Sequence, residues 1–316
     1  MIKKVFVLLL CTLIPLISCQ NPSTSDKPRI LVSPKGLVLS FWLSVKAGAE
    51  KAGKEMNAEI IWKGPSLETD IAGQIDIIQD NINKRVDAIV VAACDATALV
   101  PILEQADRAG IPVITIDSGI NSAVPKSFIA TDNVMAAEKA ADVLARLVHE
   151  KGEVGMIPFV PGAATSIMRE QGFKKGLAKY PDMELVSVQY SQTKVEQAMA
   201  VTEDMVTAHP NLAGIFAANE AGTVGCAQAL KSRGLAGKVK LVGFDASENE
   251  LQALKDGTVD ALIVQNPHKM GYLGVKTAMQ VLNGEPVQER IDTGIMVITR
   301  KNLETPEIQA LLNPPE

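Results

Sequence analysis

Aromatic residues are scarce in this chain. Only 4% of its 316 residues are Phe, Trp or Tyr, whereas 47% are hydrophobic. The cores must therefore be aliphatic, and a chain of this length can form two domains that each bury a substantial core. Against this background the adjacent aromatic pair Phe41-Trp42 stands out.

Positive charge is also in short supply. The chain has 31 Lys and Arg against 36 Asp and Glu, which gives a formal net charge of −5, and it contains no long basic run. A protein that binds nucleic acid needs a basic surface to meet the phosphates. We therefore expect no nucleic-acid partner.

The motifs of common enzyme classes are missing. The sequence has three histidines, and it contains no serine elbow, no HExxH and no CxxC. Gly222 and Gly225 follow an expected strand but lack the full glycine pattern of a dinucleotide fingerprint. We expect no catalytic residue, no metal site and no cofactor.

No apolar run is long enough for a comfortable transmembrane helix, which needs about 20 residues. The run at 5–17 follows Lys3-Lys4 and leads into Leu16-Ile17-Ser18-Cys19, so residues 1–18 are expected to be a signal peptide. The last four residues resemble a bacterial lipobox, which implies cleavage before Cys19 and lipid attachment to its thiol. An ordinary signal peptide with a chance cysteine is the alternative.

Residues 19–28 have no apolar periodicity and are expected to form a lipidated tether. The protein would then be exported to the cell envelope and held by its lipid anchor, in the periplasm or on the outer face of a membrane. Cys94 and Cys226 remain in the body of the chain, one in each half. We expect two buried free thiols rather than a disulfide.

Short apolar runs typical of strands alternate with helical patterns from Arg29 onward. Strands are expected at 29–33, 58–62, 87–92 and 112–117, then at 153–158, 183–190, 212–218, 239–244 and 260–265, with a further apolar run at 294–299. Asp132 is the expected N-cap of a long helix between the two series. Alternation of strand and helix predicts an α/β protein with two similar lobes, each a doubly wound parallel sheet.

Polar or aromatic residues follow these strands at equivalent places. Asp117, Asn219, Asp245 and Gln265 each end a strand, Phe41-Trp42 lie beyond the first, and Arg169 is expected to open a helix after the strand at 153–158. Ligands of open α/β sheets bind outside the carboxyl ends of the strands. Aromatic rings suit the C–H faces of a sugar, while carboxylates, amides and a guanidinium suit its hydroxyls. A helix cap at Asp245 and a core role for Phe41 are the alternatives for those residues taken singly.

In this order, several stretches resemble the periplasmic sugar-binding proteins of the ribose-binding type, the receptors of ABC importers. They are Ser40-Phe41-Trp42, Ile111 to Asp117, Thr131-Asp132-Asn133, Arg169 to Phe173, Thr207 to Pro210, Ala218-Asn219-Glu220, Val242 to Asp245 and Val264 to Pro267. The resemblance implies that Phe41 and Trp42 sandwich the sugar and that Phe244 adds an apolar contact. It implies acceptors at Asp117 and Asp245, a donor at Arg169, amides at Asn219 and Gln265, and a polar contact at Lys35.

The family fold implies the type I periplasmic binding protein architecture, with lobes at 29–131 plus 266–294 and at 132–265 plus 295–316. Three strands would cross between the lobes as a hinge, and the lobes would close around the ligand. The implied partners are a sugar or polyol and an ABC permease with its ATPase, and the body is expected to be monomeric.

The chain also departs from the ribose binders. Leu39 replaces an asparagine, Ser118 replaces an arginine, and the ring aromatic of the second lobe falls near Gln192-Thr193. We therefore expect a sugar or polyol other than D-ribose. Trp62 and Lys35 are candidates to fill the space left by the missing arginine and aromatic side chains.

Three other functions are compatible with parts of this pattern. A receptor for a chemoreceptor or sensor kinase would have the same sequence features as an importer's receptor. Asp117 and Asp245 could form the carboxylate pair of a glycoside-processing enzyme, although no proton donor stands beside them. The effector lobe of a repressor has the same fold, but the leader and the lack of a helix-turn-helix before Arg29 oppose it.

Overall fold

The computed structural model describes residues 27–314. The expected signal peptide, the lipid-attachment residue Cys19 and most of the tether lie outside the described residues. Within 27–314, no helix is long and apolar enough to cross a membrane.

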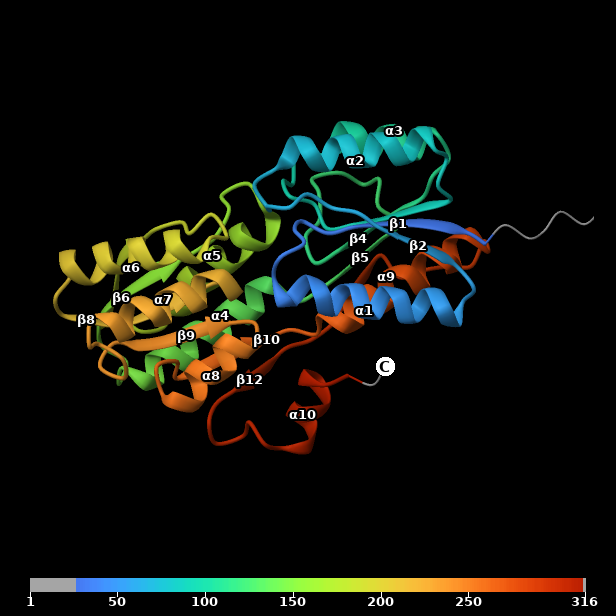
Figure 1. Ribbon diagram of the computed structural model, residues 1–316. Coiled ribbons are helices and arrows are strands. Elements are labelled where there is room, and N and C mark those ends of the chain that lie inside the picture. Colours follow the sequence, from blue (N-terminus) through green and yellow to red (C-terminus); the bar gives the residue numbers. More distant parts are fainter. Residues whose placement is uncertain (1–26, 315–316) are drawn as a thin grey trace, which may run out of the picture.

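The first sheet has six parallel strands in the order β11-β5-β4-β3-β1-β2. Its strands are β1 (Arg29–Ser33), β2 (Glu59–Trp62), β3 (Ala88–Val91), β4 (Val113–Ile116), β5 (Ser127–Ala130) and β11 (Arg290–Asp292). Its helices are α1 (Ser40–Glu55), α2 (Ile71–Asn83), α3 (Val100–Arg108) and α9 (Pro267–Leu282). As Figure 1 shows, α2 and α3 cover one face of this sheet, and α1 and α9 lie on the other.

The second sheet has the order β12-β10-β9-β8-β6-β7, and only β12 runs antiparallel to its neighbour. Its strands are β6 (Gly152–Ile157), β7 (Met183–Val188), β8 (Leu212–Ala217), β9 (Lys240–Phe244), β10 (Ala261–Val264) and β12 (Met296–Ile298). Its helices are α4 (Asn133–Leu147), α5 (Ala164–Leu177), α6 (Val195–Ala208), α7 (Glu220–Ser232), α8 (Glu248–Asp256) and α10 (Pro306–Leu312).

The predicted fold class is confirmed: the chain is α/β, with two parallel-dominated sheets covered by helices. Strands β3, β4 and β10 are buried along their whole length, which is typical of parallel strands that have helices on both faces. Asp132 is the N-cap of α4, as predicted, and its side chain accepts a hydrogen bond from the backbone N–H of Met135 at 3.0 Å.

The chain passes between the two sheets three times: from β5 to α4, from β10 to α9, and from β11 to β12. As a result, one edge strand of each sheet comes from near the end of the sequence: β11 in the first sheet and β12 in the second. The predicted limits of the two lobes remain a prediction, and below we call the part built on the first sheet the first lobe and the other part the second lobe.

Helices α1 and α9 pack with their backbones almost in contact. A Cβ atom on Gly48 would lie 2.0 Å from the carbonyl oxygen of His268, and one on Gly271 would lie 1.9 Å from that of Val45. Only glycine fits such an approach. This packing fixes α1, whose first turn carries Phe41 and Trp42.

Candidate ligand-binding site

Two aspartates at the carboxyl ends of the sheets have unusual backbone geometry. Asp117 directly follows β4 with φ of 54°, and Asp245 directly follows β9 with φ of 85°. Residues other than glycine rarely adopt positive φ, and such strain concentrates at functional sites. Both aspartates are buried.

Both aspartates line a small cavity between the lobes, which we call the inner cavity. Its volume is about 20 Å³, enough for roughly one water molecule. Eleven residues from both lobes line it: Lys35, Leu39, Phe41, Trp42, Glu68, Asp117, Phe159, Arg169, Asn219, Asp245 and Gln265. All the predicted ligand-binding residues except Phe244 are in this set.

The aromatic pair stands in the first turn of α1. The rings of Phe41 and Trp42 meet edge to face, with 4.8 Å between their centroids and 89° between their planes. The indole N–H of Trp42 donates to Oε1 of Glu68 at 2.9 Å, and the other oxygen of Glu68 accepts from Thr193 of the second lobe at 3.2 Å.

Lys35 is buried in the middle of the cavity wall. Its Nζ lies 2.9 Å from Oδ2 of Asp117 and donates to Oγ1 of Thr165 in the second lobe at 3.1 Å. It also lies 5.6 Å from the ring centroid of Trp42 and 5.4 Å from that of Phe159. Burial alone would lower the pKa of Lys35, but the charges of Asp117 and Glu68 outweigh it and the pKa is raised.

Arg169 faces this group from the second lobe. The sequence predicted that Arg169 opens a helix, and this is wrong: α5 begins at Ala164, and Arg169 lies in its second turn. Nε donates to Oδ1 of Asn133 at 2.8 Å, and Nη1 donates to the carbonyl oxygen of Ala218 at 2.6 Å. Burial lowers the pKa of Arg169, against the opposing charges of Asp245 and Asp117.

The ligand contact predicted for Phe244 stays a prediction. Phe244 belongs to the core of the second lobe and does not line the inner cavity. The guanidinium carbon of Arg169 lies 3.6 Å from its ring centroid. Phe244 therefore packs against the guanidinium of Arg169 from the core of the second lobe, in a cation–π contact.

The two amides of the second lobe are held by neighbouring groups. Asn219 is the N-cap of α7, and its Oδ1 accepts from the N–H of Gly222 at 2.9 Å. Nε2 of Gln265 donates to Oδ1 of Asp245 at 2.7 Å. Burial raises the pKa of Asp245, although the charge of Arg169 and the Gln265 hydrogen bond oppose the rise.

Polar atoms without a hydrogen bond gather at this edge of the sheets. Among the described residues, Asp117 Oδ2, Ser118 Oγ and Gln265 Oε1 are buried and have no hydrogen-bond partner. Asp117 Oδ2 has only its ion pair with Lys35. Buried polar groups are nearly always hydrogen-bonded in native proteins. Of these three residues Asp117 and Gln265 line the inner cavity, and the unpartnered oxygen of Gln265 makes it suited to a ligand with hydroxyl groups.

A family model of the periplasmic binding protein domain matches residues 30–286. This chain belongs to that family. The D-ribose/D-allose-binding protein of Pseudomonas aeruginosa is 32% identical over 305 residues, which cover 93% of this chain and 95% of the relative.

Solved structures of solute-binding proteins superpose closely on this periplasmic binding protein. A carbohydrate transporter solute-binding protein from Agrobacterium radiobacter, in complex with D-arabinose, has a TM-score of 0.90 and 35% identity, over 92% of this chain and all of that one. An ABC transporter solute-binding protein from Agrobacterium vitis, bound to α-D-tagatopyranose, has a TM-score of 0.87 and 34% identity, over 90% and 99% of the two chains.

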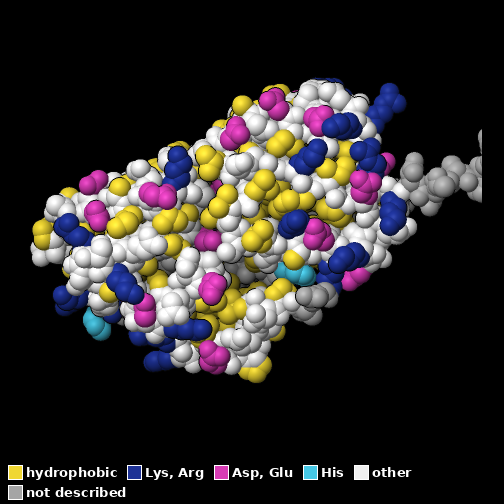
Figure 2. Space-filling model, in the orientation of Figure 1, with side chains coloured by type: hydrophobic (Ala, Val, Ile, Leu, Met, Phe, Trp, Pro, Cys, Tyr) yellow, Lys and Arg dark blue, Asp and Glu magenta, His cyan; other side chains and the backbone are white. Residues whose placement is uncertain are grey.

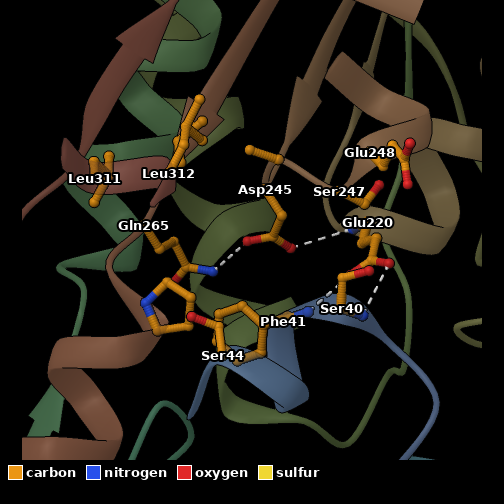
Figure 3. A pocket seen from close by; sticks show the side chains of 13 residues that line it. Ser40, Phe41, Ser44, Glu220, Asp245, Ser247, Glu248, Gln265, Leu311 and Leu312 are labelled. Carbon is orange, nitrogen blue, oxygen red and sulfur yellow. Dashed lines mark hydrogen bonds between the residues drawn. The ribbon is translucent and has the colours of Figure 1, made fainter. Parts of the chain in front are cut away.

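A second, larger cavity adjoins the inner one in this periplasmic binding protein, and we call it the outer cavity. Its volume is about 200 Å³, and it shares Phe41, Asp245 and Gln265 with the inner cavity. Figure 3 shows these three residues together with Glu220, which comes from the second lobe, and Ser40, which comes from the first. Leu311 and Leu312 of α10 lie at its margin.

Sequence reasoning missed Glu68 and Phe159. Phe159 stands two residues after β6, so the search for aromatic residues beyond strand ends would have found it. It lines the inner cavity from the second lobe, whereas the sequence indicated that an aromatic residue of that lobe was lost near Gln192-Thr193. Glu68 lies in a long loop and carries no such signal. Trp62 packs against the core of the first lobe and lines neither cavity.

Both remaining cysteines are free and buried, as predicted, and burial raises the pKa of the Cys94 and Cys226 thiols to about 12. Within residues 27–314, no group of three or more His, Cys, Asp and Glu side chains could hold a metal ion. On the face seen in Figure 2, acidic and basic side chains are interspersed.

Proposed function

We propose that this protein binds one monosaccharide or related polyol between its lobes and delivers it, chemically unchanged, to an ABC importer. Solute-binding proteins of similar fold hold D-arabinose and α-D-tagatopyranose, and the Pseudomonas relative is a D-ribose/D-allose-binding protein. The residues that line the inner cavity carry the binding.

The observation that supports this function best is the chemistry of the cavity wall. Carboxylates at Asp117 and Asp245 accept hydrogen bonds, Lys35 and Arg169 donate them, and the rings of Phe41 and Trp42 lie beside them. A sugar presents hydroxyl groups that donate and accept, and C–H faces that stack on aromatic rings. A sugar hydroxyl can then donate to Gln265 Oε1, which is buried without a hydrogen-bond partner.

Binding requires movement, because a cavity of about 20 Å³ is far smaller than a sugar ring. Hydrogen bonds from Lys35 to Thr165 and from Thr193 to Glu68 join the lobes. We infer that the lobes separate about the three connecting segments to admit the ligand and then close on it.

The departures at Leu39 and Ser118 argue against D-ribose, and the ligands named for similar proteins supply the sugars to test. D-Allose, D-arabinose, D-tagatose and xylitol form the first panel, with D-ribose as the comparison that we expect to bind more weakly. Isothermal titration calorimetry with the purified body, residues 20–316, measures each affinity. Failure of every sugar and polyol to bind at millimolar concentration would overturn the proposal.

Asp245→Asn tests the site. Loss of a charged acceptor from a buried hydrogen bond costs roughly 1.5–3 kcal/mol, so affinity for the best ligand should fall by about tenfold or more. Asp260→Asn is the matched control, because Asp260 is a carboxylate of the same lobe whose side chain is only 7% exposed. It lies at the opposite end of the sheet and is bonded to Lys240 and to the N–H of Leu241. Equal affinities of the two variants would contradict the site assignment.

We also propose that the protein is exported and anchored by a lipid on Cys19, with a monomeric body. Labelling of cells with a palmitate analogue should mark the wild type, and Cys19→Ser should abolish the label and release the protein in soluble form. Label retained by Cys19→Ser would contradict the anchor. Light scattering of the body should give the mass of one chain.

A further inference from the structure

Glu220 of the second lobe contacts the first lobe through backbone hydrogen bonds. It is the first residue of α7 and is 7% exposed. Its Oε1 accepts from the N–H of Ser40 at 3.2 Å, and its Oε2 accepts from the N–H of Phe41 at 3.1 Å. Figure 3 shows the carboxylate of Glu220 facing the start of α1 in the outer cavity.

The first turn of α1 has no cap of its own. Leu39, at the N-cap position, has no side-chain oxygen to accept a hydrogen bond. The N–H groups of Trp42 and Leu43 bond to the carbonyl oxygen of Leu39. The N–H groups of Ser40 and Phe41 are left without an acceptor within the helix. The first N–H groups of any helix lack partners within the helix, and here the other lobe supplies the acceptor.

The backbone of Glu220 also contacts a residue of the candidate ligand site. The backbone N–H of Glu220 donates to Oδ2 of Asp245 at 3.2 Å. Helix α1, which Glu220 caps, carries Phe41 and Trp42 into the inner cavity. Glu220 thus connects an acceptor of one lobe with the aromatic residues of the other.

We propose that Glu220 is a positioning residue, an N-cap for α1 that acts across the two lobes and is complete only when they are closed. The inference rests on the proposed closure of the lobes around a ligand. When the lobes separate, the N–H groups of Ser40 and Phe41 lose the carboxylate as acceptor and bond to water instead. The carboxylate also carries the charge that a helix N-terminus favours, so closure gains an interaction that the open form does not have.

Paired spin labels test the proposal on the protein body. Arg108→Cys in the first lobe and Lys238→Cys in the second lie at exposed positions, and the two native thiols are buried. Pulsed electron spin resonance gives the distances between labels without sugar and with saturating sugar. Calorimetry gives the affinity, and thermal unfolding shows that each variant is folded.

Glu220→Gln removes the charge and Glu220→Ala removes the cap. Glu248→Gln is the matched control, because Glu248 lines the same outer cavity, is exposed, and makes no hydrogen bond to the first lobe among the described residues. A helix cap corresponds to roughly a two- to thirtyfold change in an equilibrium constant. We expect Glu220→Ala to weaken binding or lower the closed fraction by that factor, Glu220→Gln to have a smaller effect, and Glu248→Gln to match the wild type.

Two results overturn the proposal. One is a Glu220→Ala protein that closes and binds as the control does. The other is a wild type whose labels show no closed population with or without sugar. A panel on which no sugar binds, combined with a closed population that Glu220→Ala reduces, would instead overturn the proposed function and leave the cap supported.

Discussion

The ammonium nitrogen of Lys35 lies 2.9 Å from a carboxylate oxygen of Asp117, and both side chains are at most 4% exposed. A buried ion pair contributes little net stability, because removing two charges from water offsets their attraction. Its place in the wall of the inner cavity is better explained by ligand binding, since an ammonium and a carboxylate can serve hydroxyl groups as donor and acceptor.

Lys35→Met should weaken both folding and binding. Breaking a buried pair from one side leaves a carboxylate unpaired, which costs about 3–5 kcal/mol, and the affinity for the best sugar should fall more than about tenfold with the loss of a charge-assisted donor. Urea unfolding and calorimetry measure the two effects.

Lys126→Met is the matched control for this change. Lys126 pairs with Asp107 at the same distance of 2.9 Å, but the two side chains are 45% and 40% exposed. An exposed pair is worth about 1 kcal/mol at most. Equal losses of unfolding free energy in the two variants would mean that breaking the buried Lys35–Asp117 pair costs no more than breaking an exposed one.

The strand-end rule explains why most of the site was predictable. Asp117, Asp245 and Gln265 each follow a strand directly, and Asn219 lies two residues after β8. The carboxyl ends of parallel strands meet at one edge of a sheet. The rule therefore placed Asn219, Asp245 and Gln265 at one edge of the second sheet. Asp117 follows a strand of the first sheet, and its place in the same site was implied by the family resemblance. Strands β5 and β11 were missed because they do not fit the alternation of strand and helix: no helix separates β4 from β5 or β11 from β12.

Contacts across the lobes were not predictable. Glu68 bonds to Trp42 and Thr193, and Glu220 bonds to α1, but nothing in a single sequence reports which loops of two lobes meet. The position of Phe244 outside the inner cavity has a simpler cause. Successive side chains of a strand point to opposite sides, and Phe244, at the end of β9, turns into the core under Arg169.

The two tryptophans of this chain should report on the ligand differently. Trp42 is 1% exposed and lines the inner cavity, whereas Trp62 lies outside both cavities. We expect Trp62→Phe to retain the fluorescence change on sugar binding and Trp42→Phe to lose it. Titration of both variants with the best sugar decides this. A signal that follows Trp62 would place the ligand elsewhere.

Glu250 should make the protein less stable as the pH rises. It is fully buried, and its Oε1 has no hydrogen-bond partner. Burial raises its pKa well above the usual 4.5, and the charges of Asp245 and Glu220 add to the rise. The folded protein therefore binds this proton more tightly than the unfolded chain does, so the stability is complete below pH 4.5 and is lost as the pH rises through the folded-state pKa.

Glu250→Gln should remove that loss. The amide oxygen can still accept from the N–H of Ser247, which now donates to Oε2 at 2.7 Å in the capping box of α8. We expect a higher urea midpoint than wild type at pH 8 and a smaller difference at pH 5. Glu248→Gln, in the same helical turn but exposed, should follow the wild type at both values. A Glu250→Gln midpoint that falls with pH as steeply as the wild-type midpoint would show that Glu250 does not titrate as stated.

A double-mutant cycle tests whether Phe244 acts through Arg169. Arg169→Lys keeps the charge but loses the planar fork and the stacked guanidinium, so the affinity for the best sugar should fall by about tenfold or more. Phe244→Leu should also weaken binding, because the guanidinium then loses the ring 3.6 Å away. If Phe244 has no other role in binding, the double variant should bind about as weakly as Arg169→Lys alone, with a coupling free energy of roughly 1 kcal/mol.

Phe216→Leu is the control for damage to the core. Phe216 is fully buried in the same aromatic cluster, 6.3 Å from Phe244 between ring centroids, and has no contact with Arg169 among those the structure describes. Its effect on affinity should couple to that of Arg169→Lys more weakly than the effect of Phe244→Leu does, since Phe216 reaches the guanidinium only through Phe244. Strong coupling for Phe216 as well would show that general loosening of the core, and not the stack on Phe244, sets the position of the guanidinium.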